Sequence, residues 1–123
     1  MAQLVRSVVS IEYRPSLAAR ARKTLARLGI PNVTVLDGDG SDGSPVFSPY
    51  DAIVVGAGAP EAPSDLISQL SKRGKMVVPV GTTNLQHLTF IRRSVQGLSE
   101  EVKEDCVSVP LVGRQGWRHS GAK

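Results

Sequence analysis

The sequence has little of what several common classes of site require. Its single cysteine, Cys106, cannot form a disulfide within the chain, and we expect it to be a buried thiol in a strand. Aromatic residues make up only 4% of the chain, which leaves few rings on which nucleic-acid bases could stack. No apolar run approaches the roughly 18 residues of a membrane-spanning helix, and the N-terminal stretch lacks a secretory signal pattern. We therefore expect a cytoplasmic protein that binds neither nucleic acid nor membranes.

Negative charge is also in short supply. The chain has 15 Lys and Arg against 11 Asp and Glu, a net charge of +4. Much of the excess lies on a predicted helix and near the C-terminus, at Arg14, Arg20, Arg22, Lys23, Arg27, Arg114, Arg118 and Lys123. With so few aromatics, a solvent-exposed helix face explains this charge better than a nucleic-acid interface does. No cluster of Cys and His supports a metal site.

What is present is the pattern of an α/β domain. With 123 residues, 41% of them hydrophobic, the chain can form one domain with its own core. We predict strands at 8–11, 33–36, 50–55, 75–80, 87–92 and 102–111, and helices at 15–28 and 65–71. The last two strands are joined too closely for a helix, so we expect a mostly parallel sheet with an antiparallel C-terminal hairpin.

The helix at 15–28 is defined by an apolar stripe, Leu17, Ala21, Leu25 and Leu28. We expect residues 1–112 to form the domain and residues 113–123 to form a tail. Trp117 in that tail is either a packing anchor or an exposed contact.

The segment DGDGSDG at 37–43 matches the glycine spacing of a dinucleotide loop. Pro45 and Pro49 follow it, however, and exclude the helix that such a loop must open. Asp42 and Ser48 stand where a calcium loop requires Gly and Glu, so that interpretation fails as well. A loop at the carboxyl end of a strand remains, where open α/β sheets bind ligands. Asp39 there either accepts a hydrogen bond from a ligand or shapes the turn.

Glu12 ends the first predicted strand and stands just before a helix. In nucleotide-binding α/β domains a carboxylate at this point binds the ribose hydroxyls, with a glycine-rich loop ~20 residues earlier. Counting back from Glu12 passes Met1 before reaching such a loop. Glu12 is therefore either an ordinary strand-end acid, or this domain lacks its first strand–helix unit.

Four segments together resemble one family. They are SVVSIEYRPSLAARARKTLARLGIPNVTVLDGDG at 7–40, YDAIVVGAGAPEAP at 50–63, LSKRGKMVVPVG at 70–81 and VPLVGRQGW at 109–117. In order and approximate spacing they are similar to the protein-L-isoaspartate O-methyltransferases. The strand-end Glu and GDG are typical of methyltransferases that use S-adenosylmethionine, and APEAP and VPVG narrow the resemblance to this family.

The resemblance implies an incomplete Rossmann-like methyltransferase fold. It implies transfer of a methyl group from S-adenosylmethionine to the carboxylate of isoaspartyl residues in damaged proteins. It also implies roles for individual residues. The cofactor would be bound by Glu12, Gly38, Asp39, Gly40, Gly56 and Ala57, and the isoaspartyl peptide by Ala59, Pro60, Pro110 and Leu111.

The family's Ser/Thr segment around the substrate carboxylate and its glycine-rich loop have no counterpart in this sequence, so no catalytic residue is assigned. The alternative is a truncated, non-catalytic module that binds adenosine or a partner. The strand before that loop would lie centrally in the sheet, and its absence leaves unpaired strand edges. We therefore expect either a homodimer or a marginally stable chain.

Overall fold

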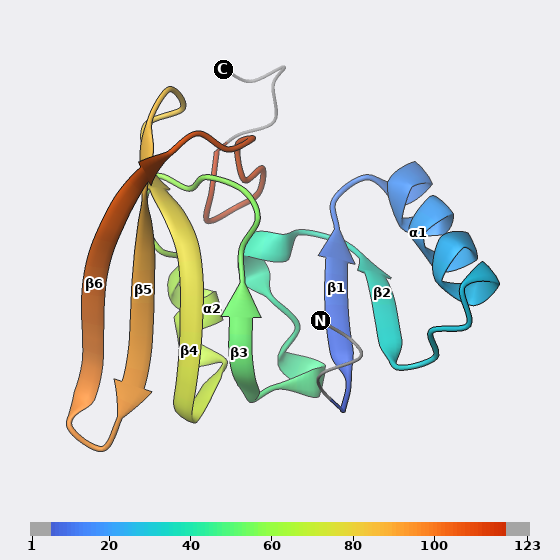
Figure 1. Ribbon diagram of the computed structural model, residues 1–123, viewed down its shortest axis with the longest axis horizontal. Helices are drawn as coiled ribbons and strands as arrows, with labels where there is room; N and C mark the ends of the chain where they lie inside the picture. Colours follow the sequence, from blue (N-terminus) through green and yellow to red (C-terminus); the bar gives the residue numbers. More distant parts are fainter. Residues whose placement is uncertain (1–5, 118–123) are drawn as a thin grey trace. The chain divides into compact units, whose positions relative to one another are not determined.

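The computed structural model describes residues 6–117, and the chain divides into two compact units, Met1–Gly40 and Ser41–Lys123 (Figure 1). This division falls inside residues 1–112, the span expected to be one domain. Residues 118–123 of the expected tail lie outside the described residues. No helix within residues 6–117 is long and apolar enough to cross a membrane.

The first unit is a strand–helix–strand motif. It consists of β1 (Val8–Glu12), α1 (Pro15–Arg27) and β2 (Val33–Asp37), and the two strands pair in parallel. Both strands are rich in β-branched residues, which favour extended backbone. The helix begins at a proline in its first turn and is followed by Gly29, whose φ of +69° suits a helix C-terminus. These three elements confirm the sequence prediction to within one residue at each end.

The buried face of α1 differs from the expected leucine stripe. Ala18 is fully buried, whereas Leu17 and Leu28 are 40% and 64% exposed. Arg22 is exposed, as expected from the sequence, and it also donates from Nε and Nη2 to the backbone oxygen of Val35, at 3.1 and 2.7 Å. The Arg22 guanidinium therefore joins the helix to β2, and Ala18 is the buried residue of the helix.

The second unit is a four-stranded sheet with one short helix. Along the chain it contains β3 (Tyr50–Val54), α2 (Ser64–Ser68), β4 (Leu70–Gly81), β5 (Gln86–Ser94) and β6 (Gly97–Cys106). The strands lie in sequence order across the sheet. β3 and β4 are parallel, while β4–β5 and β5–β6 are antiparallel. The C-terminal hairpin is confirmed, and the antiparallel part of this sheet extends one strand further than expected.

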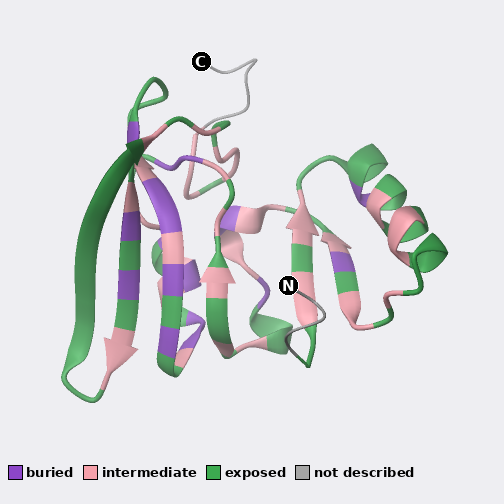
Figure 2. Cartoon of the chain, in the orientation of Figure 1, coloured by how far each residue is buried: buried purple, intermediate pink, exposed green. Residues whose placement is uncertain are grey.

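The core of the second unit lies between α2 and one face of β4 and β5 (Figure 2). Its buried residues are Ala59, Leu66, Leu70, Met76, Val78 and Ile91. Met76 and Val78 are buried, whereas Lys75 and Val77 are more exposed, which is the period of two expected for a sheet covered on one face; Pro79 beyond them is buried as well. This packing fixes the carboxyl end of β4, beside which the loop after β3 runs.

The last strand lies five residues earlier than the predicted span 102–111. Ser94 pairs with Gly97 across a turn formed only by Val95 and Gln96, so β6 begins at once after β5. Gly97 has a φ of +113°, which favours glycine there. β6 ends at Cys106, which is half-buried rather than buried. The prediction was wrong because a two-residue turn replaces the longer connection read from the sequence.

The edges of the two sheets differ in character. β6 is exposed along nearly its whole length and carries five charged residues, as Figure 2 shows by its colour. Charged edge strands of this kind resist pairing with other chains. Within residues 6–117, β1 pairs only with β2, and β3 pairs only with β4. β1 and β3 are both short and largely apolar, and each leaves one side without a strand partner.

Candidate functional site

Glu12 is the last residue of β1 and lies opposite Asp37, the last residue of β2. Its Oε1 accepts a hydrogen bond from the backbone N–H of Arg14 at 3.2 Å. Its backbone oxygen accepts one from the N–H of Gly38 at 3.0 Å. The structure thus brings Glu12 and Gly38 together at the carboxyl ends of two parallel strands, where ligands bind in open α/β sheets.

The next residues turn the chain away from β2. Gly38 has a φ of +154°, which favours glycine. At Gly40 an added Cβ would lie 3.9 Å from Cγ2 of Ile11, an ordinary contact, so nothing in the first unit requires glycine there. Asp39 is half-buried and has an interaction partner of its own. Its role, as a ligand acceptor or as a turn-forming residue, stays a prediction.

The second half of DGDGSDG belongs to the second unit and is held by Gln69. Gln69 is 6% exposed, and its Nε2 donates to the backbone oxygen of Asp42 at 2.8 Å. Its Oε1 accepts from the N–H of Ser44 at 2.9 Å. Gly43 lies between these two bonds with a φ of +66°, and an added Cβ would collide with the Gln69 amide. The third glycine of the motif is therefore explained by packing within this unit.

The loop after β3 lies between two other segments. Gly58 donates to the oxygen of Val109 and accepts from the N–H of Leu111, both at 2.7 Å. The N–H of Ala59 donates to Pro79 at 2.9 Å, and its oxygen accepts from Gly81 at 3.0 Å. Three of the predicted substrate-site residues, Ala59, Pro110 and Leu111, are consequently close together.

Steric crowding explains one glycine of this loop and leaves another unexplained. An added Cβ at Gly58 would lie 2.8 Å from Cδ of Gln86, so no larger residue fits without displacing that side chain. At Gly56 an added Cβ would have no neighbour within 4 Å. Gly56 is exposed and Ala57 half-buried, which leaves both accessible to a ligand.

The predicted substrate-site residues differ in how accessible they are to a ligand. The side chain of Ala59 is fully buried and both its backbone polar groups are already bonded, so Ala59 sets the position of the loop. Pro60 is exposed and lines a hollow of about 370 Å³. The rest of that hollow is formed by Glu61, Ala62, Pro63, Ser64, Arg114, Gln115 and Gly116.

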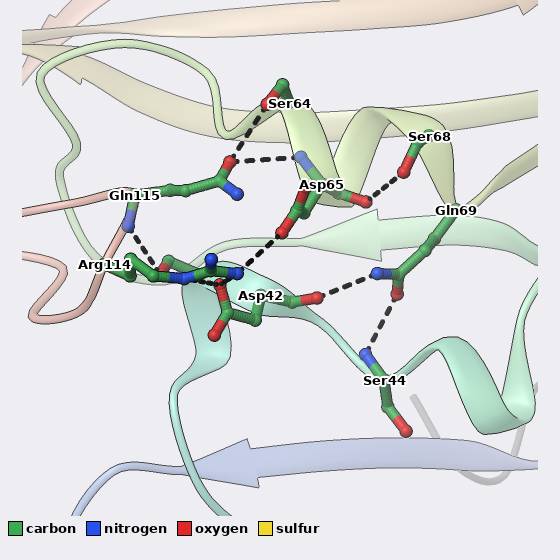
Figure 3. A network of polar contacts seen from close by, with 9 residues as sticks. Asp42, Ser44, Ser64, Asp65, Ser68, Gln69, Arg114 and Gln115 are labelled. Atoms are coloured by element: carbon green, nitrogen blue, oxygen red, sulfur yellow. Dashed lines mark hydrogen bonds and ion pairs between the residues drawn. The ribbon is translucent and has the colours of Figure 1, made fainter.

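An ion-pair network beside this hollow was not foreseen from the sequence (Figure 3). The Arg114 guanidinium donates to Oδ1 of Asp42 from Nε and Nη2, at 3.1 and 2.8 Å, and its Nη2 lies 3.3 Å from Oδ2 of Asp65. These partners lie 72 and 49 residues away in the chain, so no local spacing could reveal them.

Gln115 completes the network. Its Oε1 accepts from the Asp65 N–H and the Ser64 hydroxyl, each at 3.1 Å, and its own N–H donates to the hydroxyl oxygen of Ser41 at 3.0 Å. Residues 113–117 of the expected tail are thereby held against the start of α2. Within residues 6–117, no group of His, Cys, Asp and Glu could hold a metal ion.

The arrangement can be compared with known proteins. The family model described as protein-L-isoaspartate (D-aspartate) O-methyltransferase matches residues 1–116. The chain belongs to this family. That family assignment confirms the resemblance read from the four sequence segments and the Rossmann-like fold class.

Individual relatives agree with the family model. The protein-L-isoaspartate O-methyltransferase of Methanoregula boonei is 42% identical over 119 residues, which cover 97% of this chain and 55% of that protein. That of Pyrococcus horikoshii is 44% identical over 121 residues, 96% of this chain and 55% of the relative. The chain therefore spans about half the length of the curated relatives it matches.

Solved structures show the same fold. One protein-L-isoaspartate O-methyltransferase superimposes with a TM-score of 0.81 at 33% identity, covering 89% of this chain and 35% of the other. A second, from Plasmodium falciparum, gives a TM-score of 0.74 at 24% identity over 86% of this chain and 52% of its own. That second protein is described as a putative member of the family in complex with S-adenosyl-L-homocysteine.

Proposed function

We propose that this chain forms the adenosine-binding part of an enzyme that transfers a methyl group from S-adenosylmethionine to isoaspartyl carboxylates in damaged proteins. The observation that carries the proposal is the position of Glu12, at the end of β1 and bonded through its backbone to Gly38. The names of the relatives and the ligand described for the Plasmodium falciparum protein support it.

The residues of the first unit fit an adenosine. Oε1 of Glu12 is used by the Arg14 amide, whereas Oε2 has no hydrogen-bond partner within residues 6–117. A half-buried carboxylate with free acceptor capacity matches the paired hydroxyls of a ribose. Gly38 has no Cβ, so its backbone leaves room for the flat adenine ring. The carboxylate of Asp39, the next residue, would accept a hydrogen bond from the adenine amino group.

Methyl transfer to a carboxylate depends on the relative position of the methyl donor and the carboxylate more than on proton transfer. S-adenosylmethionine, when bound, supplies a methyl group already activated by a sulfonium. The isoaspartyl carboxylate is ionised at neutral pH and needs no base to attack. The residues of this chain therefore act by holding and orienting: Glu12 would fix the ribose, and the paired segments at Gly58 and Pro110 would form the peptide cleft.

The proposal extends to the setting of the reaction. Isoaspartyl proteins or peptides are the proposed substrates, and the cytoplasm is the proposed compartment. We assign no catalytic residue. This reaction requires the substrate carboxylate to be positioned, and no described side chain is assigned to that role.

Binding of S-adenosylhomocysteine tests the proposal most directly. Calorimetric titration of the 123-residue chain should show saturable binding, and Glu12→Ala should weaken it about 10- to 100-fold, since hydrogen bonds to a charged group contribute about 1.5–3 kcal/mol. Glu104→Ala, which removes an exposed carboxylate from β6, is the matched control and should bind as the unchanged chain does. Binding that survives in Glu12→Ala would contradict the role given to this residue.

A transfer assay then separates the two functions considered. The chain is incubated with labelled S-adenosylmethionine and an isoaspartyl peptide, with the same peptide containing ordinary aspartate as control. Methyl transfer to the first peptide alone would support the enzyme. Binding of S-adenosylhomocysteine without any transfer would favour the non-catalytic adenosine-binding module.

A further inference from the structure

A second hollow in the larger unit is lined by basic side chains. It has a volume of about 430 Å³ and is formed by Arg73, Lys75, Arg92, Arg93, Ser94 and Val95. Four of these six residues are cationic and none is acidic. Such a concentration of one sign of charge is a candidate for binding an anion.

The charges in this hollow are not balanced by neighbouring acids. Lys75 of β4 and Arg92 of β5 are direct cross-strand partners, an arrangement of like charges that destabilises a sheet. Neither makes an ion pair within residues 6–117, and the same holds for Arg73. The exposed acid Glu101 on β6 is already paired with Lys103 at 3.2 Å. Lys75 and Arg92 therefore repel each other, and a neutral substitution of either residue would remove this repulsion.

Arg93 is held in place by the protein backbone. Its Nη2 donates to the backbone oxygen of Ile67 in α2 at 2.6 Å, which restrains the guanidinium before any ligand arrives. Its Nε is buried and has no acceptor among the described residues. Arg93 alternates with Arg92 along β5 and faces the α2 side of the sheet, so it adds a fixed positive charge beside the hollow, and Lys75 and Arg92 face the other side.

Within the second unit, the hollow lies at the other end of β4 from the loop assigned to the peptide. Lys75 is near the amino end of the regular part of β4, whereas the loop containing Ala59 pairs with Val80 at its carboxyl end. Five to six residues of extended strand separate these points by roughly 18 Å. An anion bound here would therefore not occupy the loop assigned to the peptide.

We propose that this hollow is a binding site for a phosphate monoester group. Guanidinium groups form paired hydrogen bonds with phosphate oxygens, and those of Arg73 and Arg92, together with the ammonium group of Lys75, match a tetrahedral anion with three terminal oxygens. A single planar carboxylate would use only one of them. No aromatic side chain lines the hollow, so the recognised group is the phosphate rather than a stacked base.

Titration of the full 123-residue chain with inorganic phosphate at low ionic strength tests the site, followed by backbone amide shifts in the NMR spectrum. We expect saturable shifts at Lys75 and Arg92–Val95, and at least a tenfold loss of affinity in Lys75→Gln and Arg92→Gln. Lys72→Gln is the matched control, because it removes the same charge from the same exposed segment outside the hollow. No saturable binding, or an equal loss in Lys72→Gln, would overturn the proposal.

Stability without ligand gives an independent readout. Lys75→Gln should raise the thermal midpoint of the free chain slightly, because the cross-strand repulsion with Arg92 is relieved, while abolishing the stabilisation that phosphate confers. A lowered midpoint of the free chain would show that Lys75 serves the fold rather than a ligand, and would contradict the proposal.

The source of the phosphate is distinguished by three further ligands. A phosphoserine peptide that binds more tightly than inorganic phosphate indicates a modified protein, and a sugar phosphate that does so indicates a metabolite. The third ligand is the same peptide with glutamate in place of phosphoserine. If the glutamate peptide binds as well as the phosphopeptide, the site recognises carboxylates and the phosphate proposal fails.

Discussion

Gly43 is enclosed by a single side-chain amide. Gln69 bonds to the residues on either side of it, Asp42 and Ser44, so the amide spans the glycine and leaves no room for a Cβ. A positive φ and a steric limit thus coincide at one position. The two effects act together, because displacing Gln69 to admit a larger residue also breaks its two hydrogen bonds.

Gly43→Ala should therefore lower the free energy of unfolding by about 2 kcal/mol, from left-handed backbone strain plus weakened hydrogen bonds. Urea denaturation followed by circular dichroism measures this. Gly56→Ala is the matched control: an added Cβ there meets no atom within 4 Å, and we expect less than about 0.5 kcal/mol. Equal effects of the two substitutions would show that the Gln69 contact does not matter.

At the scale of single residues, the sequence was informative wherever function or turn chemistry is local. Glu12 could be singled out because strand, acid and helix follow one another directly, and the loop containing Gly38 because it follows the end of a predicted strand. Arg114 could not be singled out. Its acidic partners are brought to it only by the folded chain, and a lone arginine near a C-terminus has the same pattern as any solvated charge.

The segment after β6 depends on one buried side chain. Gln86 is 1% exposed, and its amide accepts from the N–H of Ser108 at 2.8 Å and donates to the oxygen of Thr82. Beyond Ser108, the chain bonds to Gly58 on both sides of Pro110. Gln86 therefore anchors the segment that carries Pro110 and Leu111 to the start of β5.

Gln86→Ala should destabilise the unit by about 2 kcal/mol, through a cavity and an unpaired Ser108 N–H. It should also speed hydrogen exchange of the Gly58 and Leu111 amides more than that of amides in the β4–β5 ladder. Gln96→Ala, in the exposed turn before β6, is the control and should change neither quantity. Uniform acceleration across the sheet would show a global rather than a local effect.

At the scale of elements, periodicity predicted type well and boundaries less well. Apolar β-branched runs located β1, β2 and β3 within one residue, because these strands are largely defined by their own composition. β6 was misplaced because its exposed residues, GLSEEVKEDC, carry no apolar alternation. The apolar VSVPL that follows was read as strand, yet Pro110 cannot donate in a ladder and its neighbours pair with Gly58 instead.

At the scale of the whole molecule, we expect the side of β3 that has no strand partner within residues 6–117 to determine whether copies of the chain associate. β3 is a five-residue, mainly apolar strand with one strand partner in the described part of the chain, and Val54 on it is 61% exposed. Such an edge favours pairing with another strand. The homodimer expected from the sequence remains a prediction, and this edge is where we place its contact.

Val54→Lys should shift the purified chain toward monomer in sedimentation experiments, since a lysine on an edge strand opposes pairing. Stability per chain should change by less than about 1 kcal/mol because the side chain is exposed. Val95→Lys, at the 94% exposed turn between β5 and β6, is the control for added charge. A chain that sediments as a well-folded monomer before any substitution would count against the dimer.

The two ends of the four-stranded sheet are unlike, and this asymmetry sets a limit on assembly size. One end is β6, whose acids and lysine discourage a further strand, and the other is β3, which has a single strand partner within residues 6–117. If two copies associate through this sheet, each contributes its β3 edge to the contact. The charged β6 strands then form the two outer edges of the combined sheet. Growth along this direction therefore stops at a pair, so association through this sheet produces a closed dimer instead of a fibre.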